Sequence, residues 1–247
     1  MKVKICGITN LDDARAALEA GADVLGFNFY TKSSRYITPE KAREIAAQIR
    51  SDGRRPLLVG VFVNAPPEEV QSILEIAQID LAQLHGDEPV HVLERLNGRG
   101  FKALRPTSET EAEIDAEWFA PYGPNAPVLL IDAYRRDQYG GTGLTADWSI
   151  ATKLAQQYPI LLAGGLTPEN VTEAIRQVRP WGVDVASGVE VSPGKKDAGK
   201  MKLFVERCQR LNNESADERR LNGEGFQRIS DAHGHYDQHS TDDNPQS

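Results

Sequence analysis

The feature that most constrains this chain is a regular alternation of short β-rich runs with amphipathic helical segments. The β-rich runs lie at 2–8, 23–29, 56–63, 81–86, 101–105, 128–133, 159–163 and 183–187. The helical segments lie at 11–20, 39–50, 66–78, 89–97, 109–119, 146–157, 168–178 and 197–211. Strands that alternate with helices in this way predict a parallel sheet covered by helices, which is an α/β fold.

Local signals support several of the helix boundaries. Thr38 and Thr167 are each followed by proline and glutamate, the order expected for an N-cap residue with proline at the first helical position. Gly21 lies where the first helix should end, and glycine is the residue that most often ends a helix. These signals predict helices that begin at Pro39 and Pro168.

The count of strands alone fits both a doubly wound open sheet and a closed (β/α)₈ TIM barrel. Two observations favour the barrel: the repeat is even throughout, and polar residues collect at the carboxyl ends of strands from both halves of the chain. An active site drawn from the ends of many strands is typical of that barrel. We therefore predict a single barrel domain over 1–211.

Charge and cysteine content exclude several classes of protein. The formal net charge is −8, from 28 basic and 36 acidic residues, and duplex-binding proteins usually carry a basic excess. The two cysteines, Cys6 and Cys208, have no metal-binding spacing. The sequence contains no run of about 20 apolar residues and no signal-peptide pattern. We expect a cytoplasmic protein that binds no nucleic acid, membrane or metal.

Side chains alternate across a strand, so the apolar pattern predicts which residues face the barrel interior. Outward-facing positions are expected at Val3, Ile5, Leu84, Leu129, Ile131, Val183 and Val185. Inward-facing positions are expected at Lys4, Cys6, Gln83, His85, Leu130, Asp132 and Asp184. Lys4 and Asp184 would lie on neighbouring strands, where a structural ion pair is the simplest interpretation.

Three of these inward-facing residues form a candidate catalytic group. Cys6 alone would more often be a small buried hydrophobe, and His85 alone a hydrogen-bonded structural histidine. Asp132 is harder to explain, because a carboxylate in an apolar run needs a partner or a function. A thiol, an imidazole and a carboxylate that converge on one barrel mouth favour a catalytic function.

Glycine-rich turns follow the last two strands. Gly164 and Gly165 end the seventh strand, and Ser187 and Gly188 follow the eighth. Loops in these positions commonly bind phosphate in such barrels through backbone N–H groups. Each turn alone could be merely tight, but the pair predicts a phosphorylated small-molecule ligand.

A third glycine cluster surrounds Gly141 and Gly143, and residues 141–146 match the G-x-G-x-x-A pattern of dinucleotide-binding proteins. That interpretation is rejected because the glycines do not follow the strand directly and the next strand ends in Ala-Gly-Gly, not in an acidic residue. A lid over the barrel mouth is the favoured interpretation. No cofactor is expected.

Taken together, these motifs resemble the phosphoribosylanthranilate isomerase family, whose members perform an Amadori rearrangement in tryptophan biosynthesis. The resemblance runs from Val3 to about Cys208. It is carried by VKICGIT (3–9), GADVLGFNFY with SSRYIT (21–38), VGVFVN (59–64), QLHGDE (83–88), LLIDA with GGTG (129–143), LLAGGLTPENV (161–171) and DVASGVE with PGKKD (184–197).

The resemblance implies a role for individual residues. Asp132 would be the general acid and Cys6 the general base, while Arg35 would contact the anthranilate moiety. His85 and Asp184 would lie near the substrate without a proton-transfer step. The phosphate loops would contain Gly164, Gly165, Ser187 and Gly188, with Gly141 and Gly143 in the closing lid.

Two alternatives stay open. A sugar-phosphate isomerase of the histidine-pathway type is disfavoured by Cys6, because such enzymes usually use two aspartates. A non-catalytic barrel that binds a phosphorylated metabolite is disfavoured by the presence of both Cys6 and Asp132. One chain would supply a whole site, so both a monomer and a homodimer fit.

The repeat stops near 212, and 212–247 is polar with few apolar residues. Such a segment cannot bury enough surface to fold, so we predict a disordered tail. Three of the five histidines lie in it, but solvated side chains are a better interpretation than a metal tract. Deletion of 212–247 is expected to leave melting temperature and catalytic rate unchanged, and a large fall in either quantity would contradict this prediction.

Overall fold

The computed structural model describes residues 1–133 and 148–221, with side chains described up to Leu211. Eight parallel strands form a closed barrel in chain order, with β8 hydrogen-bonded to β1. The strands are β1 (Lys2–Cys6), β2 (Val24–Asn28), β3 (Leu57–Phe62), β4 (Leu81–Leu84), β5 (Gly100–Leu104), β6 (Leu129–Asp132), β7 (Ile160–Ala163) and β8 (Gly182–Val185). The prediction of a closed barrel over an open sheet is confirmed.

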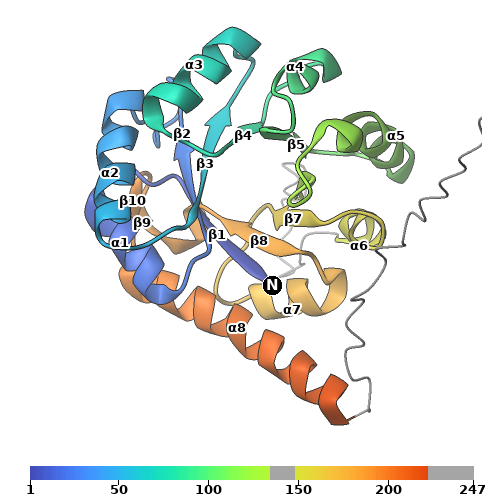
Figure 1. The fold of residues 1–247 in the computed structure, drawn as a ribbon. Coiled ribbons are helices and arrows are strands. Elements are labelled where there is room, and N and C mark those ends of the chain that lie inside the picture. Colours follow the sequence, from blue (N-terminus) through green and yellow to red (C-terminus); the bar gives the residue numbers. More distant parts are fainter. Residues whose placement is uncertain (134–147, 222–247) are drawn as a thin grey trace, which may run out of the picture. The chain divides into compact units, whose positions relative to one another are not determined.

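Helices follow the strands and surround the barrel, as Figure 1 shows. They are α1 (Leu11–Ala20), α2 (Pro39–Ser51), α3 (Pro67–Ala77), α4 (Val90–Arg95), α5 (Glu109–Phe119), α6 (Ser149–Ala155), α7 (Val171–Val178) and α8 (Ala198–Leu221). Two short 3₁₀ helices, η1 (Ala120–Tyr122) and η2 (Ser187–Val189), follow α5 and β8. Among the described residues, no helix has the length and apolar character needed to cross a bilayer.

The capping signals are confirmed at two of three helix ends. The Thr38 side chain accepts a hydrogen bond from the Lys41 N–H, and Pro39 is the first residue of α2. Gly21 ends α1 with a φ of 100°, a left-handed conformation that favours glycine. The predicted start at Pro168 is wrong, because α7 begins at Val171. Asn170 Oδ1 accepts from the Thr167 N–H and its Nδ2 donates to the Gly165 carbonyl, which forms a turn before the helix.

The last part of the chain differs from expectation in two ways. A two-stranded antiparallel hairpin, β9 (Glu190–Ser192) with β10 (Lys195–Lys196), lies between β8 and α8 and was not predicted. Helix α8 was expected to end near 211, but its backbone is helical to Leu221. Glu, Ala, Arg and Leu make up six of the ten residues 212–221, and their helix propensity explains the continuation. The part of the predicted disordered tail from 222 onward lies outside the described residues. A variant truncated after Leu221 should therefore be compared with the variant that lacks 212–247.

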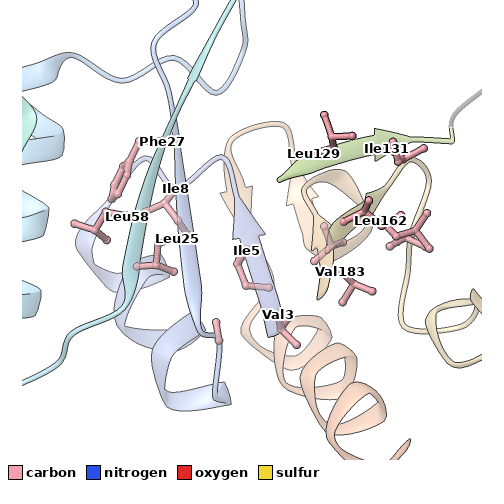
Figure 2. Close-up of a cluster of buried hydrophobic side chains, with 14 of the residues drawn as sticks. Val3, Ile5, Ile8, Leu25, Phe27, Leu58, Leu129, Ile131, Leu162 and Val183 are labelled. Carbon is pink, nitrogen blue, oxygen red and sulfur yellow. The ribbon is translucent and has the colours of Figure 1, made fainter. Parts of the chain in front are cut away.

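Two apolar layers confirm the predicted alternation of side chains. All of the residues expected to face outward, among them Val3 and Ile5 of β1 and Val183 of β8, belong to the large core cluster shared with the helices (Figure 2). Leu130 instead belongs to a smaller cluster of barrel-interior residues that also contains Val59, Phe101 and Leu161. The outward-facing residues of β1, β4, β6 and β8 are therefore those that the sequence predicts.

Candidate active site

The carboxyl end of β1 places the Cys6 thiol beside the ammonium group of Lys4. A Cβ added at Gly26, on neighbouring β2, would lie 2.8 Å from Cys6 Sγ and 3.0 Å from Lys4 Nζ, so both atoms lie over this glycine. Cys6 is 8% exposed and Lys4 is fully buried. A cation beside a thiol is the environment in which cysteines act as bases or nucleophiles.

The expected ion pair between Lys4 and Asp184 is present, with Nζ 3.0 Å from Oδ1. Burial alone would lower the pKa of Lys4, but the charges of Asp184 and Cys6 outweigh burial, so the pKa is raised above its ordinary value of 10.5. Asp184 pairs in register with Lys4, two residues before Cys6 along β1. Asp184 therefore lies deeper in the barrel than the Cys6 thiol, and its negative charge stabilises the protonated form of Lys4.

His85 and Asp132 lie together, as their convergence on the barrel mouth predicted. His85 follows β4 and Asp132 ends β6, and the distance from His85 Nε2 to Asp132 Oδ2 is 3.5 Å. The two side chains are 24% and 22% exposed, so both can be reached from solvent. An ionisable pair at the ends of two strands can hold or transfer a proton to a ligand at the mouth.

Arg35 forms a bidentate ion pair with Glu190, a residue to which the sequence analysis gave no role. Its Nε and Nη2 donate to Glu190 Oε1 and Oε2 at 2.8 and 2.7 Å. The pKa of Arg35 is raised, chiefly by the hydrogen bond to Glu190. A Cβ added at Gly7 would lie 2.6 Å from Arg35 Cδ, so this glycine lets the arginine side chain pack directly against the residue that follows Cys6.

Lys196 of β10 completes this charged cluster. Its Nζ donates to Glu190 Oε1 at 2.9 Å and to the Ala186 carbonyl at 3.0 Å. Burial raises the pKa of Glu190, but hydrogen bonds from Arg35 and Lys196 outweigh burial and the pKa is lowered. Burial lowers the pKa of Lys196, and Glu190 and Cys6 oppose that shift only in part. Cys6 is thus within electrostatic reach of three cations: Lys4, Arg35 and Lys196.

A second buried ion pair, between Lys102 and Glu88, stabilises the loop that carries His85. Lys102 Nζ lies 2.6 Å from Glu88 Oε2 and donates to the Gly86 carbonyl, also at 2.6 Å. Glu88 Oε1 in turn accepts from the Asn64 N–H at 2.7 Å. This pair was not predicted from the sequence. The available signal was a lysine within the apolar run 101–105, which required a partner as much as Asp132 did.

The two predicted phosphate loops lie against each other. Gly164 and Gly165 have φ values of 95° and 64°, in the left-handed region. Gly188 lies in η2, and a Cβ added there would lie only 1.9 Å from the Leu166 carbonyl oxygen. Ser187 begins the same turn. The loops after β7 and β8 therefore form one surface with closely packed backbones, whereas Gly141 and Gly143 lie outside the described residues.

Replacing Gly188 with alanine is expected to separate these two loops. The new methyl group cannot fit against a backbone carbonyl, so we expect about 1–3 kcal/mol of destabilisation and weaker binding of a phosphorylated ligand. Urea unfolding and ligand titration would measure both effects. Gly199→Ala is the matched control, because its Cβ would meet only Asp197 Oδ1 at 3.3 Å and alanine favours the helix. Equal results for the two variants would contradict the prediction.

No group of three or more His, Cys, Asp or Glu side chains that could hold a metal ion occurs among residues 1–133 and 148–221.

Comparison with known proteins identifies the family. Residues 3–207 match the family model for N-(5'-phosphoribosyl)anthranilate isomerase. The N-(5'-phosphoribosyl)anthranilate isomerase of Geotalea uraniireducens is 46% identical over 212 residues, which cover 85% of this chain and 99% of the relative. The crystal structure of phosphoribosyl anthranilate isomerase from Thermotoga maritima has a TM-score of 0.74 at 41% identity, with 85% of this chain and 98% of that chain covered. A phosphoribosyl anthranilate isomerase structure in complex with reduced 1-(o-carboxyphenylamino)-1-deoxyribulose 5-phosphate has a TM-score of 0.72 at 39% identity, with coverage of 85% and 98%. The chain, in its sequence from 3 to 207 and in its closed barrel, belongs to the N-(5'-phosphoribosyl)anthranilate isomerase family.

Proposed function

We propose that this protein converts N-(5'-phosphoribosyl)anthranilate to 1-(2-carboxyphenylamino)-1-deoxyribulose 5-phosphate, an isomerisation in tryptophan biosynthesis, by general acid–base catalysis. One observation carries the proposal. In a chain of this family, Cys6 and Asp132 end β1 and β6 of a closed barrel, and each has an ionisable neighbour at hydrogen-bonding or ion-pairing range. The two groups can therefore act on one ligand at the barrel mouth.

Asp132 would act first, as the acid that opens the furanose ring. Its proton moves to the ring oxygen, the bond from that oxygen to C1′ breaks, and the anilino nitrogen lone pair forms a protonated Schiff base. Free aspartic acid is ionised near neutral pH, so Asp132 must carry its proton in the complex. The negative charges of a bound substrate would favour the protonated form of a carboxyl group beside them.

Cys6 would act second, as the base that removes the C2′ proton. The electron pair of that C–H bond forms a C1′–C2′ double bond and neutralises the iminium, giving an enolamine. Tautomerisation of the enolamine then gives the ketone. The cations of Lys4, Arg35 and Lys196 around Cys6 support this role, because they would balance the negative charge of the sulfur that acts as the base.

Binding would be shared between the loops of the barrel mouth. The N–H groups of the loops at Gly164, Gly165, Ser187 and Gly188 would hold the phosphate. Arg35 would face the anthranilate carboxylate while Glu190 fixes its guanidinium. Gly141 and Gly143 would belong to the lid.

The reaction transfers protons within one molecule and has no redox or hydrolytic step, so it requires no cofactor. The described catalytic side chains come from one chain, which would let a monomer act alone and would give a homodimer two separate sites. We also propose that the protein acts in the cytoplasm, where its small phosphorylated substrate would be made.

The direct test is steady-state turnover of freshly prepared N-(5'-phosphoribosyl)anthranilate, followed by the loss of its fluorescence, at neutral pH without metal or nucleotide. Rapid turnover by the full chain would support the proposal. Folded protein without turnover would overturn the specific reaction and leave a barrel that binds a phosphorylated ligand.

A further inference from the structure

Gln83 makes a directional contact with His85 that the proposed acid–base steps do not use. Gln83 lies on β4 with 1% of its surface exposed, and its side chain points into the barrel below His85. Its Nε2 is 2.8 Å from His85 Nδ1. An amide nitrogen donates hydrogen bonds and cannot accept them, so with the amide in this orientation Nδ1 is the acceptor. The neutral His85 ring then carries its proton on Nε2.

This tautomer of His85 determines whether the ring nitrogen that faces Asp132 carries a proton. His85 Nε2 is the ring atom that faces Asp132 Oδ2, at 3.5 Å. A proton on Nε2 is therefore placed toward Asp132 Oδ2 at ion-pairing distance, and we expect the acid proton of Asp132 on its other oxygen, Oδ1. A charged imidazolium would be unfavourable in this arrangement, because its Nδ1–H would point at the Gln83 amide N–H. It would also place a full positive charge beside Asp132 and hold the carboxylate ionised.

Among the described residues, the two carboxylates that follow His85 on the same loop have cationic partners of their own. Glu88, on the same loop, forms the buried pair with Lys102, and Asp87 lies 3.8 Å from Arg105. Asp132 on β6 is thus the carboxylate that faces the ring. Within the described part of the chain, Gln83 Oε1 is buried and has no hydrogen-bond partner. Its Nε2 bond to His85 is therefore what orients the amide.

We propose that Gln83 is a positioning residue that keeps His85 neutral with its proton on Nε2, and that this state leaves Asp132 able to carry its proton on Oδ1 for ring opening. The inference rests on the proposed function, in which Asp132 is the general acid. Gln83 acts only through His85, since its side chain lies below the mouth and is closed to the substrate.

Nitrogen-15 NMR of labelled histidine side chains tests the first half of this proposal without any substrate. The five histidines are His85, His91, His233, His235 and His239. The His85 signals are assigned as those that disappear in His85→Gln. In the full wild-type chain we expect the His85 ring to be neutral at pH 7 with the proton on Nε2. A ring protonated on Nδ1, or charged, would overturn the proposal.

Two substitutions that change the end of the Gln83 side chain test whether Gln83 controls the protonation of His85. Gln83→Glu offers an acceptor to Nδ1, so we expect His85 to become doubly protonated at a pH where the wild-type ring is neutral. Gln83→Met removes the hydrogen bond without adding charge, and we expect a mixture of neutral tautomers. If Gln83→Glu does not fold, the tautomer populations in Gln83→Met decide the proposal alone.

Kinetics separate positioning from a merely structural role. We expect kcat of Gln83→Glu to fall by at least about tenfold near neutral pH with little change in KM, and to recover as rising pH removes the added imidazolium proton. A structural defect would instead lower kcat in both variants by the same factor at every pH, and this outcome would overturn the proposal.

The NMR and kinetic outcomes distinguish the two levels of inference. Normal wild-type turnover with the wrong His85 tautomer overturns the role of Gln83 and leaves the reaction standing. The expected tautomer without wild-type turnover overturns the reaction, and the catalytic role of Gln83 fails with it.

Discussion

Asp132→Asn and Cys6→Ser are each expected to lower kcat for N-(5'-phosphoribosyl)anthranilate by at least about two orders of magnitude. General acid–base catalysis contributes roughly 10²–10⁴-fold per group, and each substitution removes one group. Asparagine has no proton to give to the ring oxygen. Serine is far less acidic than cysteine, so it cannot supply the anionic base that the neighbouring cations would stabilise.

The measurement is the fluorescence assay at saturating substrate, with circular dichroism to verify folding. Cys208→Ser is the matched control for the thiol, because Cys208 is also buried but lies in helix α8, and burial raises its pKa to about 12. That thiol stays protonated, and we expect its replacement to leave kcat near the wild-type value. A loss in Cys208→Ser as large as that in Cys6→Ser would indicate damage to folding and would contradict the role of Cys6.

The pH dependence of the single variants would show which group acts as the acid. If Asp132 donates the proton that opens the ring, Asp132→Asn should lose the part of the kcat profile that falls as pH rises. A profile unchanged in shape, with only its height reduced, would point to another acid and contradict this assignment.

The barrel could be predicted from the sequence because its rules are local. Apolar alternation identified the two faces of β1, and the same two-residue period placed Lys4, Cys6, His85 and Asp132 inside. The ion pair between Lys4 and Asp184 followed from closure, because β1 and β8 become neighbours only in a barrel. Periodicity and strand order therefore carried the prediction.

Contacts between loops could not be predicted in this way. Glu190 reaches Arg35 across more than 150 residues of sequence through the hairpin of β9 and β10, which has no strong strand signal. Glu88 and Lys102 meet because the loop after β4 folds back over β5. Such pairs depend on loop conformation, which a two-residue or 3.6-residue period does not encode.

Helix starts were predictable only where a side chain accepts hydrogen bonds from the first N–H groups. Thr38 does so and α2 begins where expected. After β7, Thr167 and Asn170 bond within a tight turn instead, so the same Thr-Pro-Glu order precedes α7 by one turn.

Lys4→Met is expected to cause the largest loss of stability, about 3–5 kcal/mol in the free energy of unfolding. The substitution removes the cation from a pair in which Lys4 is fully buried and the Asp184 side chain is 9% exposed. The Asp184 carboxylate would stay in the barrel interior without a partner. Urea unfolding near neutral pH measures the change, and there the pair is fully formed because the pKa of Lys4 is raised above 10.5 by Asp184 and Cys6 against the effect of burial.

The same strand offers a matched control in Lys2→Met. Lys2 Nζ lies 2.7 Å from Asp23 Oδ1, but these side chains are 51% and 32% exposed, so water screens the pair. An exposed pair contributes at most about 1 kcal/mol, and we expect a loss no larger than that. Equal losses in the two variants would show that burial of the Lys4 pair is not what makes it important.

A double variant distinguishes the effect of the unpaired Asp184 charge from the effect of the lost Lys4 side chain. In Lys4→Met with Asp184→Asn, no net charge stays buried, so we expect much of the stability lost in Lys4→Met to return. Activity should not return with it, because Lys4 is also a cation beside Cys6. Recovery of stability without recovery of kcat would show that one lysine both neutralises Asp184 and supports the thiolate, whereas recovery of both would restrict Lys4 to a structural role.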